Sequence, residues 1–221
     1  MGVRSRPEME ARPPAARGRH APPPEVRLPL QRERLLRASA LEFAQRGYAG
    51  ASSESISRRA AMSKATFYEH FANKEECMLA LFDLATEVLQ EAMASAVRNA
   101  PTNDAAGRTQ AGTRAFLTSL AEHPEFAQTL LVEIIGAGPR AAQRRDQIVQ
   151  AFAEVLDAEN EAAARRGLIG RFESPFDAYA IVGAITELVS RQVRLGEPEN
   201  VLDLAPVIDR LIAGVLAPGS S

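Results

Sequence analysis

Cysteine and histidine are scarce in this chain of 221 residues, and their scarcity excludes several kinds of protein. Cys77 is the only cysteine, so no disulfide can form within the chain, and a reducing, cytoplasmic compartment is expected. The three histidines, His20, His70 and His123, have neither zinc-ligand spacing nor the Glu-x-x-His pairing of di-iron bundles. We therefore predict no metal, no cofactor and no catalytic residue, and hence no enzyme.

Long apolar runs and alternating patterns are also missing. The longest nearly apolar stretch, Ala178 to Ile185, is far shorter than the roughly 20 residues that span a bilayer. The Arg- and Pro-rich N-terminus has no apolar segment of the kind that signal peptides contain. No segment alternates with a period of two for long enough to form a sheet. We expect neither a membrane span nor a signal peptide, and an all-α fold.

Charge is unevenly distributed along the chain. Residues 1–80 contain 14 Lys and Arg against 9 Asp and Glu, a net charge of +5, whereas residues 81–221 contain 12 against 19, a net charge of −7. A cationic module ahead of an acidic body favours a nucleic-acid partner for the first part only. The alternative is an ordinary solvated surface without a partner.

The chain divides into three predicted parts. Residues 1–27 contain six Arg and six Pro but almost no large apolar side chain, so we expect a disordered arm. Residues 28–73 and 74–221 form a smaller and a larger helical domain. Apolar spacing, proline starts and glycine breaks predict about nine helices. They run from Leu30 to Gly47, Ser52 to Ala60, Ser63 to Phe71, Lys74 to about Asn99, Ala105 to Glu122, Pro124 to Ile135, Pro139 to Arg166, Pro175 to Leu195 and Leu202 to Ala217.

The segment from residue 47 to residue 76 is typical of a helix-turn-helix. Ser52 and Ser63 are suited to cap two short helices, because a serine hydroxyl accepts from exposed first-turn amides. The apolar side chains of these two helices are spaced to pack inward, so that the first helix braces the second against a major groove. They are Ile56, Ala60, Phe67 and Phe71. The alternative is a helical hairpin inside a larger bundle.

The outer residues of the second short helix have groups that suit DNA. Hydroxyl, ammonium and imidazole groups there can contact phosphates or base edges. The residues are Ser63, Lys64, Thr66, Tyr68 and His70.

This segment resembles the DNA-binding signature of the tetracycline-repressor (TetR) family of bacterial transcription regulators. The resemblance covers roughly residues 30–80 and rests on one set of residues. They are Gly47-Tyr48, Ser52, Ile56, Ala60, Ser63-Lys64, Thr66-Phe67-Tyr68, His70-Phe71 and Lys74-Glu75. It implies a homodimer with an N-terminal three-helix DNA-binding domain and a larger helical domain that holds a small-molecule pocket and the dimer interface.

The resemblance also implies roles for individual residues. Ser52 matches a hydroxyl residue that contacts phosphate, Tyr68 a tyrosine that contacts the DNA backbone, and Lys74 a lysine that touches phosphate. Ser63, Lys64 and Thr66 match the start of the recognition helix. Ala61 departs from the pattern, because the turn commonly has glycine there. A left-handed backbone at Ala61 would cost about 1 kcal/mol, and we expect the turn to adjust.

A family-like pocket would lie among large side chains of the larger domain, although most such residues in a bundle are simply core. The predicted ligand contacts are Phe82, Phe116, Leu120, Phe126, Leu130, Glu133, Ile134, Phe152 and Tyr179. Glu133 is the one carboxylate among them and would orient a ligand. The lack of basic residues in this set favours a small apolar or cationic effector over a polyanion.

The last two predicted helices each have an aliphatic stripe, and two such pairs can close a four-helix interface across a two-fold axis. The predicted interface residues are Ile181, Ile185, Leu188, Val189, Leu204, Ile208, Leu211 and Val215. The alternative is core within one chain.

Together with the resemblance to the TetR family, the sequence predicts a repressor that binds a palindromic operator in double-stranded DNA and is released by a ligand. A ligand-independent DNA-organising protein and a helical scaffold protein remain as alternatives.

Overall fold

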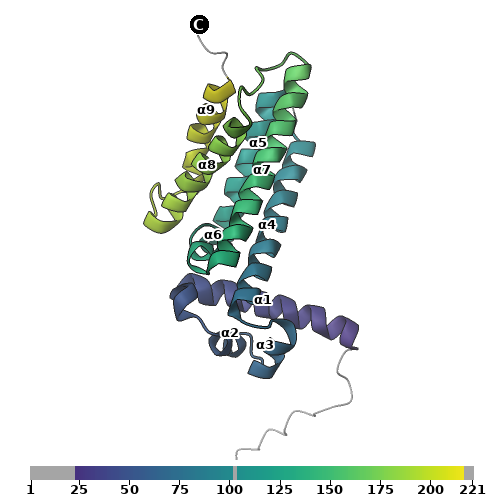
Figure 1. The fold of residues 1–221 in the computed structure, drawn as a ribbon, viewed down its shortest axis with the longest axis vertical. Coiled ribbons are helices and arrows are strands. Elements are labelled where there is room, and N and C mark those ends of the chain that lie inside the picture. Colours follow the sequence, from purple (N-terminus) through teal and green to yellow (C-terminus); the bar gives the residue numbers. More distant parts are fainter. Residues whose placement is uncertain (1–22, 102–103, 217–221) are drawn as a thin grey trace, which may run out of the picture.

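The computed structural model describes residues 23–101 and 104–216, and within these ranges it is all-α (Figure 1). Nine α-helices and two short 3-10 helices make up this part, and no strand occurs in it, as predicted. The α-helices are α1 Pro24–Gly50, α2 Ser53–Arg59, α3 Lys64–His70, α4 Lys74–Arg98, α5 Ala105–Glu122, α6 Pro124–Leu131, α7 Pro139–Arg165, α8 Pro175–Leu195 and α9 Ala205–Leu216. The 3-10 helices are η1 Glu133–Gly136 and η2 Val201–Leu204.

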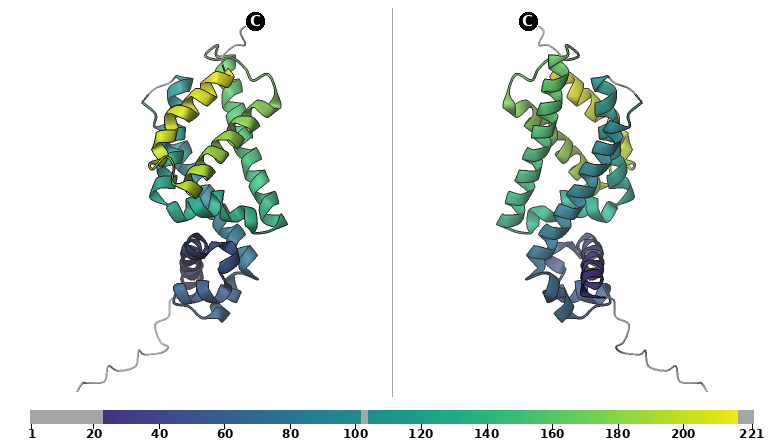
Figure 2. Two further views of the ribbon diagram at one scale, coloured as in Figure 1. Left: turned by 90° about the vertical axis from the view of Figure 1, so that its left-hand side faces the viewer. Right: turned by 90° about the vertical axis from the view of Figure 1, so that its right-hand side faces the viewer.

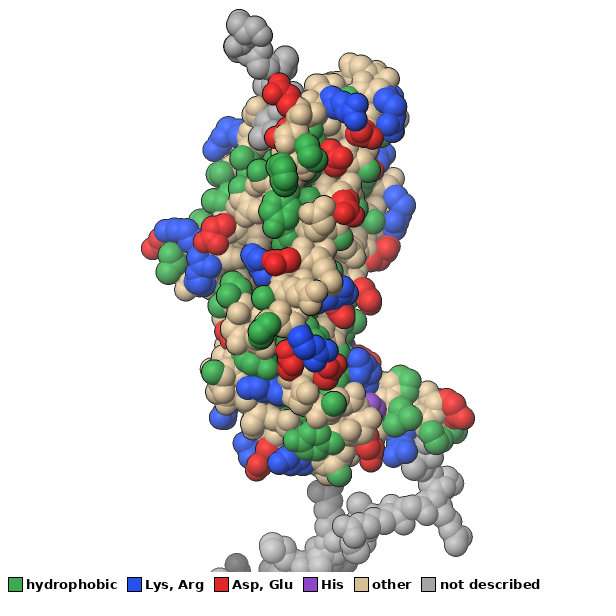
Figure 3. Space-filling view, viewed as in Figure 1, with side chains coloured by type: hydrophobic (Ala, Val, Ile, Leu, Met, Phe, Trp, Pro, Cys, Tyr) green, Lys and Arg blue, Asp and Glu red, His purple; other side chains and the backbone are tan. Residues whose placement is uncertain are grey.

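Helix α1 begins earlier than the sequence predicts. The predicted disordered arm covers residues 1–27, of which 1–22 lie outside the described residues; from Pro24 onward the chain is helical. Proline is tolerated at a helix start because its missing N–H has no partner there in any case. The first turns of α1 expose Val26, Leu28 and Leu30 (Figure 3). The helix is interrupted at Gly47, where φ is +70°, and this is the predicted break.

Helices α2 and α3 form as predicted. Ser52 and Ser63 are their N-caps, and each side chain accepts a hydrogen bond from a first-turn N–H. The four side chains predicted to pack inward are all buried, with exposed fractions of 6% or less. The tight turn therefore holds α3 against α1 and α2 with its other face outward.

The larger part is a bundle in which α4, α5 and α7 run along the long axis and α8 and α9 lie together on one side (Figure 2). The predicted bounds of α5 and α8 match the structure, and α7 ends one residue earlier than predicted. The prediction of one helix from Pro124 to Ile135 was wrong, because α6 ends at Leu131 and η1 follows. Three β-branched residues and a glycine after Leu131 weaken a continuous helix.

Two apolar cores lie along the molecule. The first contains side chains of α1–α3 and the first turns of α4, joined by Ile134, Ala137 and Ala141 from η1 and α7. The second lies among α5–α9 and η2. Leu130 packs against both cores. The predicted DNA-binding part, α1–α3 with the first turns of α4, therefore shares its side-chain packing with the bundle.

Candidate DNA-binding surface and ligand cavity

Helix α3 presents a polar face to solvent. Tyr68 is half exposed, and Lys64 is exposed with its Nζ 6.0 Å from the Tyr68 ring centroid. The Ser63 hydroxyl accepts from the Thr66 N–H at 3.0 Å and lies 2.9 Å from the Thr66 hydroxyl. Phe67 is fully buried on the opposite face. The structure thus brings Ser63, Lys64, Thr66 and Tyr68 together on or beside the outer face of a braced helix.

Ser52 closes the start of α2 through a reciprocal pair of hydrogen bonds. Its hydroxyl accepts from the Ser55 N–H at 3.1 Å, and its own N–H donates to the Ser55 hydroxyl at 3.0 Å. The side chain remains exposed. Because the hydroxyl oxygen accepts the bond from the Ser55 N–H, its proton remains available to donate to a phosphate oxygen.

Lys74 has a structural role that the sequence does not indicate. Its ammonium donates to the carbonyl oxygens of Tyr48 at 2.6 Å and Ala51 at 3.0 Å, and it lies 4.1 Å from the Tyr48 ring centroid. Burial lowers the pKa of Lys74. The lysine that opens α4 therefore holds the connection between α1 and α2, and at most one of its three N–H groups remains for a phosphate.

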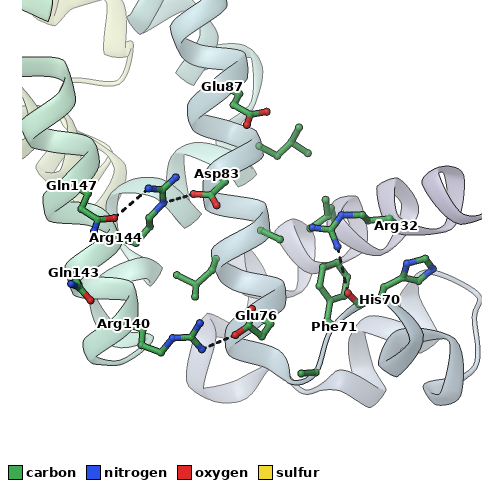
Figure 4. Close-up of a pocket in the computed structure, with 15 residues that line it drawn as sticks. Arg32, His70, Phe71, Glu76, Asp83, Glu87, Arg140, Gln143, Arg144 and Gln147 are labelled. Carbon is green, nitrogen blue, oxygen red and sulfur yellow. Dashed lines mark hydrogen bonds and ion pairs between the residues drawn. The ribbon is translucent and has the colours of Figure 1, made fainter.

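His70 is turned toward α1 (Figure 4). Its Nε2 lies 3.4 Å from the Gln31 side-chain oxygen, and its carbonyl accepts from Arg32 at 3.4 Å. Burial, and then the positive charge of Arg32, lower the pKa of His70, so the ring is neutral near pH 7. Among the predicted DNA contacts, His70 is the one whose ring packs back onto its own domain.

Ala61 adopts the left-handed conformation in the turn between α2 and α3, with φ +53°. It is the one non-glycine residue with positive φ in the part of the chain that the structure describes. The turn therefore keeps its shape and accepts the strain, which for a residue with a β-carbon is about 1 kcal/mol.

Glu42 is a buried carboxylate that ties α1 to α2. It is 3% exposed and accepts from Arg59 Nε at 2.6 Å, with Arg46 Nε at 3.2 Å. Burial alone would raise its pKa, but hydrogen bonds from Arg59 and Ser55 and the charges of Arg59 and Arg46 together lower it. The carboxylate is consequently ionised at neutral pH and pairs two arginines of the basic module.

A cavity of about 920 Å³ lies between α4, α5, α7 and α8. Five of the nine predicted ligand contacts line it, namely Phe82, Phe116, Leu120, Leu130 and Phe152. The volume falls within the range of small-molecule pockets. Most of its wall is aliphatic or aromatic, which agrees with a ligand that has a long apolar part.

The other four predicted ligand contacts lie elsewhere. Ile134 is fully buried in the first core, and Phe126 packs against that core. Tyr179 is on the outer side of α8 and is 39% exposed. Glu133 accepts from the Tyr48 N–H at 2.6 Å and from the Gln128 amide at 2.9 Å. Its carboxylate binds the protein's own backbone, so it does not orient a cationic ligand.

Basic residues line the cavity, contrary to the prediction. Four arginines contribute to its wall: Arg98, Arg108, Arg145 and Arg166. The predicted set consists of large apolar or aromatic side chains and Glu133, all within predicted helices, whereas three of these arginines lie at helix ends. The sequence does not indicate their placement, because the ends of α4, α5 and α7 meet only in the folded chain.

A second hollow, of about 830 Å³, lies where α7 meets the DNA-binding part (Figure 4). Arg140 of α7 contacts Glu76 of α4 at 2.6 Å, and Arg144 contacts Asp83 at 2.6 Å. These ion pairs are partly exposed and contribute little to stability individually. Together they fasten the first turns of α7 to the helix that follows the recognition helix.

The predicted dimer stripes are mostly core within one chain. Ile181, Val189, Leu204 and Ile208 are 8% exposed or less, and Ile185 and Ile208 line the cavity. Leu188 and Leu211 are partly buried, and the side chain of Val215 lies outside the described part. Large aliphatic residues at helical spacing fill the interior first, so this pattern marks the inner face of α8 and α9.

Comparison with known proteins agrees with this architecture. Residues 35–81 match the family described as "Bacterial regulatory proteins, tetR family". An uncharacterized HTH-type transcriptional regulator of Bacillus subtilis, YdgC, is 27% identical over 86% of this chain and 94% of its own length. The HTH-type transcriptional activator FasR of Mycolicibacterium smegmatis is 34% identical over 48% of each chain. The regulator FadR from Bacillus subtilis, solved with stearoyl-CoA, superposes with a TM-score of 0.73 at 18% identity, covering 82% of this chain and 98% of that one.

A braced recognition helix on a helical bundle defines a DNA-binding transcription regulator of the helix-turn-helix class. The match over residues 35–81 confirms the resemblance of this segment to the TetR family of these regulators. Among the described residues there is no group of three or more His, Cys, Asp or Glu that could hold a metal ion. None of the described helices is long and apolar enough to cross a membrane.

Proposed function

We propose that this regulator is a cytoplasmic repressor that binds a palindromic operator as a homodimer and leaves it when a ligand with a long apolar part fills the cavity. One observation carries the proposal: the cavity and the core of the DNA-binding part share side chains. Phe82 belongs to that core and lines the cavity, and Leu130 and Ile148 pack against the core and line the cavity as well.

Residues 28–73, extended by the first turns of α4, are the proposed DNA reader. Lys64, Thr66 and Tyr68 on α3 would meet the major groove, and Ser52 and Ser63 would contact phosphates beside it. Lys74 would act chiefly by holding the α1–α2 connection. Residues 74–221 are the proposed ligand-binding and dimerisation domain.

The proposed dimer interface is the outer face of α8 and α9, which replaces the buried stripes. Gly183 and Gly214 have nothing within 4 Å of where a β-carbon would be, so both helices offer open, small-residue surfaces. Tyr179 and Val207 are exposed apolar side chains on the same two helices. A two-fold axis through this face would set the distance between the two recognition helices, which must be about 34–36 Å for successive major grooves.

The path from cavity to DNA would run through α6 and η1. Leu130 and Leu131 line the cavity, and the Leu131 carbonyl accepts from the buried Ser190 hydroxyl of α8 at 3.3 Å. Two residues further on, the Glu133 carboxylate holds the Tyr48 N–H at the end of α1. A ligand that prefers a displaced α6 would therefore shift the population toward a dimer with mis-spaced recognition helices.

The effector class is drawn from the cavity and from two relatives. FadR of Bacillus subtilis was solved with stearoyl-CoA, an acyl thioester. The wall of the present cavity is mainly apolar from Phe82 to Val97 of α4. A fatty acyl compound would suit both observations. FasR is an activator, so the direction of regulation is part of what must be measured.

Binding to the DNA that flanks the gene tests this proposal. Fluorescence anisotropy with a flanking duplex and with random duplex, each at several salt concentrations, should give tighter and sequence-dependent binding to the flanking DNA. Palmitoyl-CoA should then weaken that binding. Sequence-specific binding that no acyl compound changes would favour the ligand-independent DNA-organising protein. Equal, weak binding to both duplexes would favour the helical scaffold.

A further inference from the structure

The two ends of the cavity differ in charge. The end nearest the DNA-binding part is formed mainly by apolar side chains such as Phe82, Leu130 and Ile148, with Arg145 as its one basic residue. The far end is formed where α4 stops, α5 starts and α7 stops, and each of these termini contributes one arginine: Arg98, Arg108 and Arg166. Figure 1 shows these three helix ends together at the end of the molecule opposite α1–α3.

Pair interactions leave positive charge at that far end. Arg98 pairs with Glu91 at 2.7 Å, outside the cavity wall, and Arg108 pairs loosely with Glu159 at 3.7 Å. The backbone N–H of Arg166 bonds the Ala163 carbonyl at 3.1 Å, but its guanidinium has no hydrogen-bond or ion-pair partner within residues 23–101 and 104–216. Arg98 and Arg108 are each paired with one carboxylate, so the uncompensated positive charge of the lining at this end is the guanidinium of Arg166.

The shape of the cavity agrees with a ligand that is long and has one charged end. The lining residues of α4 extend from Phe82 to Arg98, a helix length of about 24 Å at 1.5 Å per residue. Gly112 permits α5 to approach α4 closely, because a β-carbon there would lie 3.2 Å from Val97. An alkyl chain fits the apolar length, and an anion fits its basic end.

We propose that Arg108 and Arg166 form a head-group site for the anion of a long-chain amphiphile, whose alkyl chain lies along α4 toward Phe82. The inference rests on the proposed ligand-binding role of the cavity and adds the residues that bind the charged end of the ligand and the direction in which its alkyl chain lies. A guanidinium binds a carboxylate or a phosphate through paired, charge-assisted hydrogen bonds. The anion is therefore either a free carboxylate or the phosphates of a coenzyme A thioester.

Three probes with the same alkyl chain separate these cases: palmitoyl-CoA, palmitate and hexadecanol. Binding to the full chain is measured by isothermal titration at low and at high salt. We expect at least one of the two anions to bind at least tenfold more tightly than the alcohol, and this advantage to fall as salt rises. Tight binding of palmitoyl-CoA with weak binding of palmitate assigns the site to phosphates, and tight binding of palmitate with weak binding of palmitoyl-CoA assigns it to a carboxylate.

Variants locate the site. The variant Arg166→Gln, alone or combined with Arg108→Gln, should lower the affinity for the preferred anion by about tenfold or more, and a tenfold loss corresponds to about 1.4 kcal/mol. The affinity for hexadecanol should not change. Arg165→Gln is the matched control, because Arg165 is adjacent, exposed and absent from the cavity wall. Arg145→Gln tests the opposite end, where Arg145 already lies 3.6 Å from Asp146.

Several outcomes would overturn the inference. One is that affinity for the preferred anion falls with Arg145→Gln and not with Arg166→Gln. The others are equal affinity for all three probes, and no binding of any probe to a chain that still binds its operator. Operator release is measured separately. If palmitoyl-CoA binds through Arg166 but never releases DNA, the proposed function fails while the head-group site stands.

Discussion

The Glu133 carboxylate accepts a hydrogen bond from the backbone N–H of Tyr48 at 2.6 Å, 85 residues away in the chain. The Tyr48 N–H lies just after the break at Gly47, where α1 would otherwise leave a donor unsatisfied. Its carbonyl accepts from Lys74 at 2.6 Å. The backbone of one residue of the DNA-binding part is thus held at its N–H by η1 of the bundle and at its carbonyl by α4.

Removing this carboxylate should uncouple the two parts. Glu133→Ala should lower the free energy of unfolding by about 1–3 kcal/mol, because the Tyr48 N–H and the Gln128 amide lose a charged acceptor. Urea denaturation measures the loss. The affinity of this variant for palmitoyl-CoA should equal that of the wild type. The decrease in operator affinity that palmitoyl-CoA causes should be several-fold smaller than in the wild type. Glu122→Ala, an exposed change at the end of α5, is the control. A full ligand response in Glu133→Ala would contradict transmission through this contact.

The two lysines of the DNA-binding signature should give different phenotypes. Lys64 is exposed on α3, so Lys64→Ala should weaken operator binding without changing the melting temperature. If Lys64 neutralises a phosphate, the slope of log affinity against log salt should fall by about 0.9. Lys74→Ala removes two hydrogen bonds to carbonyls and should lower the free energy of unfolding by about 1–3 kcal/mol. An unchanged stability for Lys74→Ala would return that lysine to a purely phosphate-binding role.

The Glu42 ion pairs should make the free energy of unfolding depend on pH in the acidic range. Because the folded-state pKa of Glu42 is lowered, its contribution is fully present above the unfolded pKa of about 4.3 and is lost as the pH falls through the folded value. Glu42→Gln should cost about 1–3 kcal/mol at pH 7, since two arginines lose a charged partner. The difference between wild type and variant, measured in urea at a series of pH values, should shrink below about pH 4. A constant difference would mean that charge plays no part.

Glycine at position 61, in the turn between α2 and α3, should stabilise the fold more than alanine does. At φ +53° an alanine side chain is strained, so Ala61→Gly should raise the free energy of unfolding by about 1 kcal/mol. The same substitution at Ala65, an exposed position inside α3, should lower it by about 0.5–1 kcal/mol, because a helix interior disfavours glycine. Thermal melts of the two variants should therefore move in opposite directions. A fall in stability for both would show that the turn is not strained at Ala61.

Local patterns predicted much of this molecule, and long-range contacts account for what they missed. Serine caps, proline starts and apolar spacing are short-range signals, and they placed Ser52, Ser63 and Phe67 correctly. Glu133 was assigned to a ligand because its partner, Tyr48, is distant in the chain and uses only its backbone, which leaves no mark in sequence. The arginines of the cavity were missed for a related reason: Arg98, Arg108 and Arg166 meet only after three helix ends converge.

The same reasoning explains the dimer stripes. A helix on the side of a bundle has one strongly apolar face, and burial in its own chain takes that face first. The outer face of α8 and α9, which is the proposed interface, has glycine, alanine and single exposed apolar residues, and these give no pattern of large aliphatic side chains in the sequence. The buried Ile208 and the exposed Val207, next to each other in α9, separate the two roles.

Aspartate at these neighbouring positions should therefore have opposite consequences. Val207 is 37% exposed, so Val207→Asp should leave the chain helical and folded but place two charges against each other across the proposed two-fold axis. Sedimentation velocity should show a monomer with an unchanged circular dichroism spectrum. Ile208 is fully buried, so Ile208→Asp puts a charge into the core and should unfold the bundle. If the Val207→Asp dimer is as stable as the wild type, the interface lies on another face. A dimer formed through the outer surface of α9 would be weakened by the buried pair of like charges.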